Sequence, residues 1–235
     1  MDTVAMHIVN GIVDAPTSLA FAAVAAAALV LCVARARDDL DERMAPMAGI
    51  TAAFIFAAQM LMFPVLPGVA GHLLGAALAA ALVGPWVGAL CVSIVLIVQV
   101  LLFADGGVTA LGLMIVNMAL IGGFVAYGLL VLLLKALPRN AAGVAAAAGI
   151  AAWASVVAGA SGFVFEYAVG GATDLGSASG AMAVSMIGVH ALIGIGEGII
   201  TVVVVLAVAR SRPDLVYALR GGKPALAPAA VGGAA

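Results

Sequence analysis

Three histidines are the side chains in this sequence best suited to binding a metal ion, because almost everything around them is apolar. His7 follows Met6 near the start of the chain, His72 lies within Gly71–Gly75, and His190 lies in a long apolar run. The chain is 66% hydrophobic and 9% charged, and a polar group held in lipid is costly and tends to face a cavity or a partner. We interpret His7 and His72 as two parts of one metal site.

The chemistry expected of His7 depends on Met6 before it. An α-amine, the next backbone nitrogen and an imidazole at the second position form fused chelate rings, and a further imidazole completes four nitrogens in a plane. That geometry suits nickel or copper and is accessible to cobalt. It requires a chain that begins Met-His, whereas residues 1–5 precede Met6 here. Translation starts at Met6, or the preceding residues are removed, or metal is bound in another way; we favour the first.

Composition places the chain among multi-spanning membrane proteins, with a mean hydropathy of +1.30. The formal net charge of -2 argues against a nucleic-acid partner, which requires a basic face. No GxxxxGK[ST] phosphate-binding loop occurs in the sequence. If transport uses ATP, we expect hydrolysis on a separate subunit and no enzymatic activity in this chain.

The apolar runs predict an all-α, multi-pass integral membrane protein with about seven transmembrane helices. Arg35, Arg37 and Arg43 follow the first run, so the positive-inside rule places the N-terminus outside and the C-terminus in the cytoplasm. His72 is expected at the outer end of the third helix, on the side of the N-terminus. The run 71–83 is too short to cross a bilayer core, so it begins earlier, near Leu66, or spans incompletely. The predicted spans are 19–34, 47–63, 71–83, 87–103, 109–134, 141–165 and 182–209.

Three regions follow from this topology. Residues 1–16 are expected to form an extracytoplasmic metal-binding segment, residues 17–210 the transmembrane helical domain, and residues 211–235 a disordered cytoplasmic tail rich in Pro, Gly and Ala. Closely spaced small residues, as in Ala145–Gly149 and Gly194–Gly198, are typical of close helix packing in membranes.

Several segments resemble the substrate-capture membrane subunit of cobalt/nickel energy-coupling-factor transporters, the CbiM/NikM family. The similarity covers residues 6 to about 210, and the Gln99–Gly112 string is its most specific part. Val9-Asn10-Gly11 departs from the Pro-Asp-Gly that family members usually carry. The segments that carry the resemblance are Met6–Ile8, Gly71–Gly75, Leu82–Trp86, Gln99–Gly112, Asn117–Ala119 and His190–Glu197.

The resemblance implies that the N-terminal amine of Met6, the backbone nitrogen and imidazole of His7 and the imidazole of His72 hold the metal. It implies that the cargo is Co²⁺ or Ni²⁺, with no permanently bound cofactor, and that cobalt uptake serves cobalamin biosynthesis. The implied partners are a transmembrane coupling protein, cytoplasmic ATPase subunits and a small accessory membrane subunit.

Five further polar residues are candidates for supporting the site or lining the path of the ion. Gln99 and Asn117 are expected to hydrogen-bond the N-terminal segment, and Asp105 to stabilise an outer turn. His190 and Glu197 are seven positions apart, on one face of a helix. His190 and Glu197 could line the path of the ion, or they could be hydrogen-bonded groups that hold helices together.

Two other classes of function compete with metal capture. A vitamin-binding capture subunit would need an aromatic or hydrogen-bonding pocket, and only 6% of the residues are aromatic. An intramembrane enzyme or a proton-coupled carrier could use His190 and Glu197 as a relay. A relay would survive the loss of His7, whereas a chelate would not.

Overall fold

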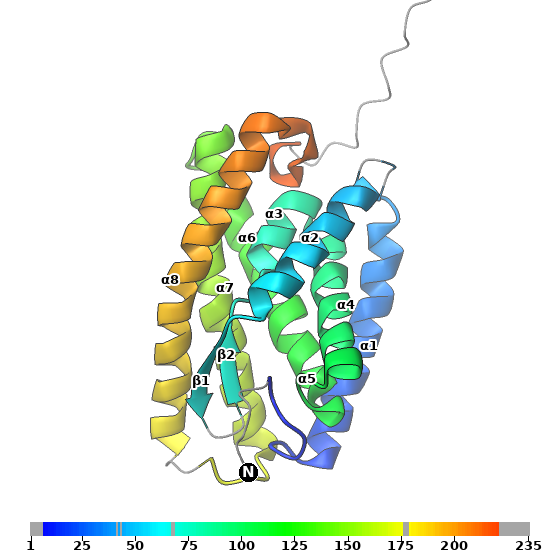
Figure 1. Cartoon of the computed structure of the whole chain (residues 1–235), viewed down its shortest axis with the longest axis vertical. Helices are drawn as coiled ribbons and strands as arrows, with labels where there is room; N and C mark the ends of the chain where they lie inside the picture. The colour runs from blue at the N-terminus through cyan, green and yellow to red at the C-terminus, as the bar shows by residue number, and fades with distance from the viewer. Residues whose placement is uncertain (1–6, 41, 43, 67–68, 176–178, 221–235) are drawn as a thin grey trace, which may run out of the picture.

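Five apolar helical segments, each long enough to cross a membrane, lie side by side in the computed structural model, which describes residues 7–40, 42, 44–66, 69–175 and 179–220 (Figure 1). The shortest has 19 residues, and about 20 helical residues cover a hydrocarbon core of about 30 Å. The predicted class, a helical integral membrane protein, is confirmed. The five segments are α1 (Ala15–Ala36), α4 (Pro85–Phe103), Val108–Leu133, α7 (Ala141–Gly170) and α8 (Ser179–Ser211).

Two of the long helices begin at side-chain caps that the sequence provides. Asp14 accepts a hydrogen bond of 2.8 Å from the Thr17 backbone N–H, and Pro16 occupies the first turn of α1. The same hydrogen bond holds the pKa of the Asp14 carboxyl below its usual value. Asn140 caps α7 by accepting 2.9 Å from the Gly143 N–H. Caps satisfy backbone donors that a helix leaves unpaired.

The segment Val108–Leu133 changes its helical winding along its length. It consists of the short 3₁₀ turn η1 (Val108–Ala110), α5 (Leu111–Met114), the π-helix η2 (Ile115–Ile121) and α6 (Gly122–Leu133). A π-helical stretch is rare and occurs most often at functional sites. Asn117 lies within this stretch and is buried, so the irregular winding coincides with a polar side chain that the apolar run contains.

The end of the predicted span 47–63 and the start of the predicted span 71–83 are wrong, because neither is helical. α2 (Met44–Gln59) is followed by the antiparallel strands β1 (Met62–Leu66) and β2 (Val69–His72) and by the short helix α3 (Ala76–Val83). His72 therefore ends a strand and does not cap a helix. Pro64 lacks the N–H that would continue α2, and Gly71 has no room for a Cβ, which would lie 2.6 Å from Ile193 Cδ1.

α3 is a half-length helix enclosed by the bundle. Its eight residues are all buried, and at about 1.5 Å per residue they cover about 12 Å. Figure 1 shows the hairpin continuing from the lower end of α2, with α3 above it beside α2 and α6. The hairpin and α3 together therefore occupy the length that one full transmembrane helix would cover. The count of seven crossings and the orientation of the chain stay predictions.

Glycines allow α7 and α8 to pack closely, as the sequence predicted for small residues. A Cβ on Gly149 would lie 2.4 Å from Val202 Cγ2, and a Cβ on Gly198 would lie 3.0 Å from the Gly149 carbonyl oxygen. Within lipid no hydrophobic effect drives helices together, so they associate through close packing of their backbones. The α7–α8 pair is the framework against which the hairpin lies.

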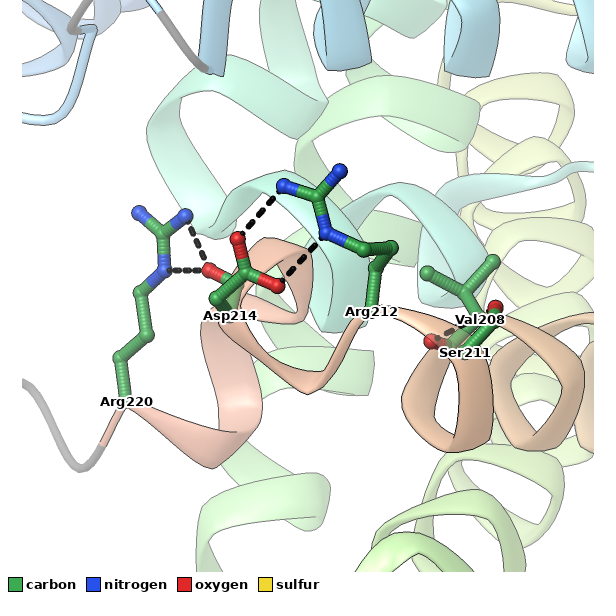
Figure 2. A network of polar contacts seen from close by, with 5 residues as sticks. All are labelled: Val208, Ser211, Arg212, Asp214 and Arg220. Carbon is green, nitrogen blue, oxygen red and sulfur yellow. Dashed lines mark hydrogen bonds and ion pairs between the residues drawn. The ribbon is translucent and has the colours of Figure 1, made fainter.

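One end of the bundle carries all of the Lys and Arg residues that lie in the described part of the chain. Figure 1 shows this end at the top, where α1, α6 and α8 finish. Figure 2 shows part of it, with the Arg212 guanidinium donating to both Asp214 carboxylate oxygens at 2.9 and 2.8 Å. These basic residues are Arg35, Arg37, Lys135, Arg139, Arg210, Arg212 and Arg220.

The first part of the expected disordered tail is ordered. Residues 213–219 form the 3₁₀ turns η3 (Pro213–Leu215) and η4 (Tyr217–Leu219), and residues 221–235 lie outside the described residues. Val216 is fully buried, and Tyr217 packs against Gly84, where a Cβ would lie 2.8 Å from the Tyr217 ring. Apolar burial orders this short segment, which the prediction had grouped with the Pro-, Gly- and Ala-rich residues that follow it.

Candidate metal site

The segment that carries His7 is bound by two loops at the end of the bundle opposite the basic residues (Figure 1). The Ile8 carbonyl oxygen accepts 2.8 Å from the Gly107 N–H, and the Ile12 carbonyl accepts 2.9 Å from the Ala172 N–H. The first loop follows α4 and the second follows α7. Main-chain hydrogen bonds on both sides therefore determine where His7 lies.

Asn10, which stands where the family resemblance leads one to expect the Asp of Pro-Asp-Gly, binds the segment that follows α4. Its Oδ1 accepts hydrogen bonds from the Thr109 N–H at 3.0 Å and from the Thr109 hydroxyl at 2.8 Å. A Cβ on Gly107 would lie 2.5 Å from the Asn10 backbone nitrogen, so the backbones of the two segments are in contact. The family's acidic residue is absent here, but an oxygen acceptor remains in its place.

His7 is almost completely buried, with 2% of its surface exposed. Its backbone N–H donates to Asp105 Oδ1 at 3.3 Å, and its Nδ1 lies 3.0 Å from the same oxygen. These are the two His7 nitrogens that a chelate would use. Both lie near one carboxylate oxygen, and neither ring nitrogen of His7 has a hydrogen bond of acceptable geometry among the described residues. Asp105 thus contacts the N-terminal segment directly.

His72 lies beside His7, with ring centroids 4.1 Å apart and ring planes tilted by 44°. The His72 Nδ1 is 2.8 Å from the Leu73 carbonyl oxygen, and because a carbonyl only accepts, Nδ1 carries the proton. Nε2 of the neutral ring then has its lone pair available for a metal. His72 is 5% exposed, so both imidazoles of the pair are buried.

A small cavity of about 40 Å³ adjoins both imidazoles. A volume of about 10 to 15 Å³ suffices for one water molecule, so the space accommodates an ion with little else. Most of its wall is apolar, and Asn117 is the polar neighbour of the two histidines. The cavity is lined by His7, Ile8, Val69, Ala70, His72, Leu74, Met114, Asn117, Met118, Gly159, Ala160, Phe163 and Met186.

His190 and Glu197 both face the hairpin from α8, as their spacing on one helix face predicted. A Cβ on Gly71 would lie 3.1 Å from His190 Cε1, so the third imidazole packs next to His72. His190 Nδ1 is 2.8 Å from the Met186 carbonyl oxygen one turn earlier. The Glu197 carboxylate contacts the backbone just after His72.

The expected hydrogen bonds from Gln99 and Asn117 to the N-terminal segment are not found in the described part of the chain. Asn117 Nδ2 instead donates 2.6 Å to Glu166 Oε2 on α7, and the Gln99 amide is buried without a partner there. Glu166 is fully buried and was not among the candidate residues. Its signal was present in the sequence, because it is the one acidic residue in the run 141–170.

Met6 lies outside the described residues, so the position of its amine is a prediction. Within the described ranges, no group of three or more His, Cys, Asp and Glu side chains is arranged to hold a metal ion. The two imidazoles are therefore the side-chain donors present. A four-nitrogen site would take its other donors from the main chain.

The fold and the site together define a class: multi-pass membrane proteins that enclose two adjacent imidazoles beside a cavity sized for an ion. Comparison with known proteins supplies the particular family. Residues 7–215 match the family model CbiM, described as the cobalt uptake substrate-specific transmembrane region. The chain belongs to the CbiM family, and it is a transmembrane component of cobalt or nickel uptake in a prokaryotic plasma membrane.

Relatives and solved structures agree with this membership. A Haloquadratum walsbyi protein, provisionally named a metal transport protein, is 36% identical over 214 residues, which are 90% of this chain and 94% of the relative. An Archaeoglobus fulgidus protein, provisionally named a fused nickel transport protein NikMN, is 38% identical over 211 residues, 90% of this chain and 68% of the relative. A crystal structure of a truncated transition metal transporter has a TM-score of 0.80 at 28% identity, covering 88% of this chain and 99% of that one.

Proposed function

We propose that this chain captures Co²⁺ or Ni²⁺ from outside the cell and releases it inward as the substrate-binding subunit of an energy-coupling-factor ABC-type importer. The ligands are the amine of a chain that begins at Met6, the backbone nitrogen and imidazole of His7, and the imidazole of His72. Imidazole nitrogen suits late divalent metals, and ligand type alone does not separate cobalt from nickel.

The observation that carries this proposal is the contact between His7 and His72. Two buried imidazoles 4.1 Å apart adjoin a cavity of about 40 Å³, although they are far apart in the sequence. In a membrane protein with three histidines, such a pair is expensive unless it binds something. Both chelating nitrogens of His7 face the Asp105 carboxylate, which adds negative charge beside the cation.

The proposal includes partners and a direction. A transmembrane coupling protein, cytoplasmic ATPase subunits and a small accessory membrane subunit complete the importer, and cobalt taken up serves cobalamin biosynthesis. The name of the fused Archaeoglobus relative supports the presence of further modules in such systems. Clustering of the described Lys and Arg residues at the end opposite His7 supports an outer position for the metal site. No catalytic step is assigned to this chain.

The alternative functions are less well supported. A vitamin needs a pocket of about 300 to 1,000 Å³, whereas the cavity at the histidines holds about 40 Å³. A proton relay through His190 and Glu197 would leave His7 without a role. Both alternatives predict that H7Q leaves activity unchanged.

The first experiment measures the intact mass and the Co²⁺ and Ni²⁺ content of the protein purified in detergent from its native membrane. We expect a chain that begins at Met6 and holds one ion. H7Q and H72Q should each abolish retention of the ion, while H190Q should keep it. A protein that begins at Met1 and binds metal equally well in all of these variants would contradict the proposal.

A further inference from the structure

A buried carboxylate from α8 binds the backbone turn that follows His72. Glu197 is 2% exposed, and its Oε2 accepts a hydrogen bond of 2.6 Å from the Leu74 N–H. Its Oε1 accepts 2.9 Å from the Gly75 N–H. Both carboxylate oxygens are therefore used on two successive amides, two and three residues beyond His72.

The opposite side of the same turn is bound by α2. Gln59 is fully buried, and its Nε2 donates 2.8 Å to the Leu74 carbonyl oxygen. Gly75 has a φ of +74°, and a Cβ there would lie 2.7 Å from Ile55 Cγ1. The turn is thus enclosed by α2 on one side and by α8 on the other, with polar contacts to each.

The Leu74 and Gly75 amides need these partners because no other acceptor for them is found in the described part of the chain. Gly75 is the N-cap of α3, and amides at a helix start are not paired within the helix. A buried donor left unpaired costs about 1 to 3 kcal/mol, and a carboxylate is also favoured by the dipole at a helix N-terminus. In lipid, water cannot replace the missing acceptor.

We propose that Glu197 is a positioning residue that places the His72 imidazole at the metal site and couples the position of α8 to metal affinity. This inference rests on the function proposed above. His72 Nδ1 is bonded to the Leu73 carbonyl, so the ring orientation follows the backbone that Glu197 holds. A displacement of α8 reaches the metal ligand through two hydrogen bonds.

The test compares E197Q with the matched control T201V in the full-length protein in detergent. Thr201 is equally buried, one turn further along α8. Gln offers one acceptor oxygen for two N–H groups, so one amide is left opposed by a donor. We expect E197Q to weaken Ni²⁺ binding about 10- to 100-fold, the usual effect of losing a group that orients a metal ligand, and T201V to leave it unchanged. E197D, which keeps both oxygens, should restore part of the affinity.

A double-mutant cycle separates positioning of His72 from a general loss of structure. Cu²⁺ is the probe, because its higher affinity keeps binding measurable after one nitrogen ligand is lost. If Glu197 acts through His72, E197Q should weaken Cu²⁺ binding about 10-fold or more in the wild type and less than about 2-fold in the H72Q background. An equal loss in both backgrounds would overturn the inference.

The outcomes distinguish this inference from the proposed function. Wild-type protein that binds neither Ni²⁺ nor Cu²⁺ would refute both. Wild-type protein that binds metal, with E197Q binding as tightly as wild type, would refute the role of Glu197 alone. Hydrogen exchange of the Leu74 and Gly75 amides in metal-free protein should be faster in E197Q than in T201V, and equal exchange rates would show that the carboxylate does not hold the turn.

Discussion

Metal binding should strengthen steeply as the pH rises, because the proposed chelate must lose protons. The amine of a chain that begins at Met6 has an ordinary pKa of about 7.7 to 8.0, and the His7 backbone amide keeps its proton until a metal replaces it. Each ion bound therefore releases at least two protons below about pH 7.5 and at least one above it. The His72 Nδ1 donates to the Leu73 carbonyl oxygen and the metal would take the Nε2 lone pair, so the count includes no proton from this ring.

The magnitude follows from the proton count. Two protons per ion change the affinity about 100-fold for each pH unit, or about 2.7 kcal/mol, because one proton per pH unit corresponds to 1.36 kcal/mol. Above the pKa of the amine the dependence should fall to about 10-fold per pH unit. The loss of affinity on acidification thus comes from main-chain nitrogen.

Competition with a chromogenic chelator for Co²⁺, from pH 6 to pH 8.5, measures this dependence. Calorimetry in two buffers of different ionisation enthalpy counts the released protons directly. A protein acetylated at its N-terminus is the control, because it has no free amine to deprotonate. Affinity that stays constant across this range, or is unchanged by acetylation, would refute a chelate built on the amine.

Three further predictions concern the surroundings of the site. N10A removes the acceptor of two hydrogen bonds from Thr109 and should weaken Co²⁺ binding about 5-fold, at about 1 kcal/mol for the net loss, while N10D should restore it; equal affinities of N10A and wild type in the chelator assay would contradict this. G149V should destabilise the helix pair by about 1 to 3 kcal/mol in thermal unfolding, since Val202 occupies the space of a Cβ, whereas G196V, where that space is open, should not. Co²⁺ at 100 times its dissociation constant should raise the free energy of unfolding by about 2.7 kcal/mol, and a chelator should reverse the gain.

The sequence predicted that His7 and His72 lie together, but it did not predict the backbone that carries His72. Counting apolar runs and basic residues placed both histidines on one side of the membrane, and the structure brings their ring centroids to 4.1 Å. That the pair binds a metal stays a prediction. The sequence analysis did not predict the hairpin between α2 and α3. A short apolar run of Gly, Pro and branched residues is compatible with a strand and with a buried helix, and periodicity does not distinguish them.

Buried polar pairs were the other part that the sequence could not specify. Gln99 and Asn117 were recognised as unusual in an apolar run, but their partners depend on which helices are neighbours. Asn117 bonds to Glu166, which is 49 positions away in the chain, and no local pattern connects them. The cost of a polar group in lipid identifies such residues singly, whereas pairing them needs the tertiary fold.

Under the proposed function, release of the ion requires more than loosening its ligands, because the bundle is closed between the site and the end that carries the basic residues. α3 fills the space beyond the Leu74–Gly75 turn with eight buried apolar residues, which offer a cation no ligand. Its far end is covered by Tyr217, whose ring is in contact with Gly84. On this proposed route α3 would have to separate from its neighbours, and α3 is held to α8 by Glu197 at one end. A partner that moves α8 would then weaken the site and open the way past α3 in the same step.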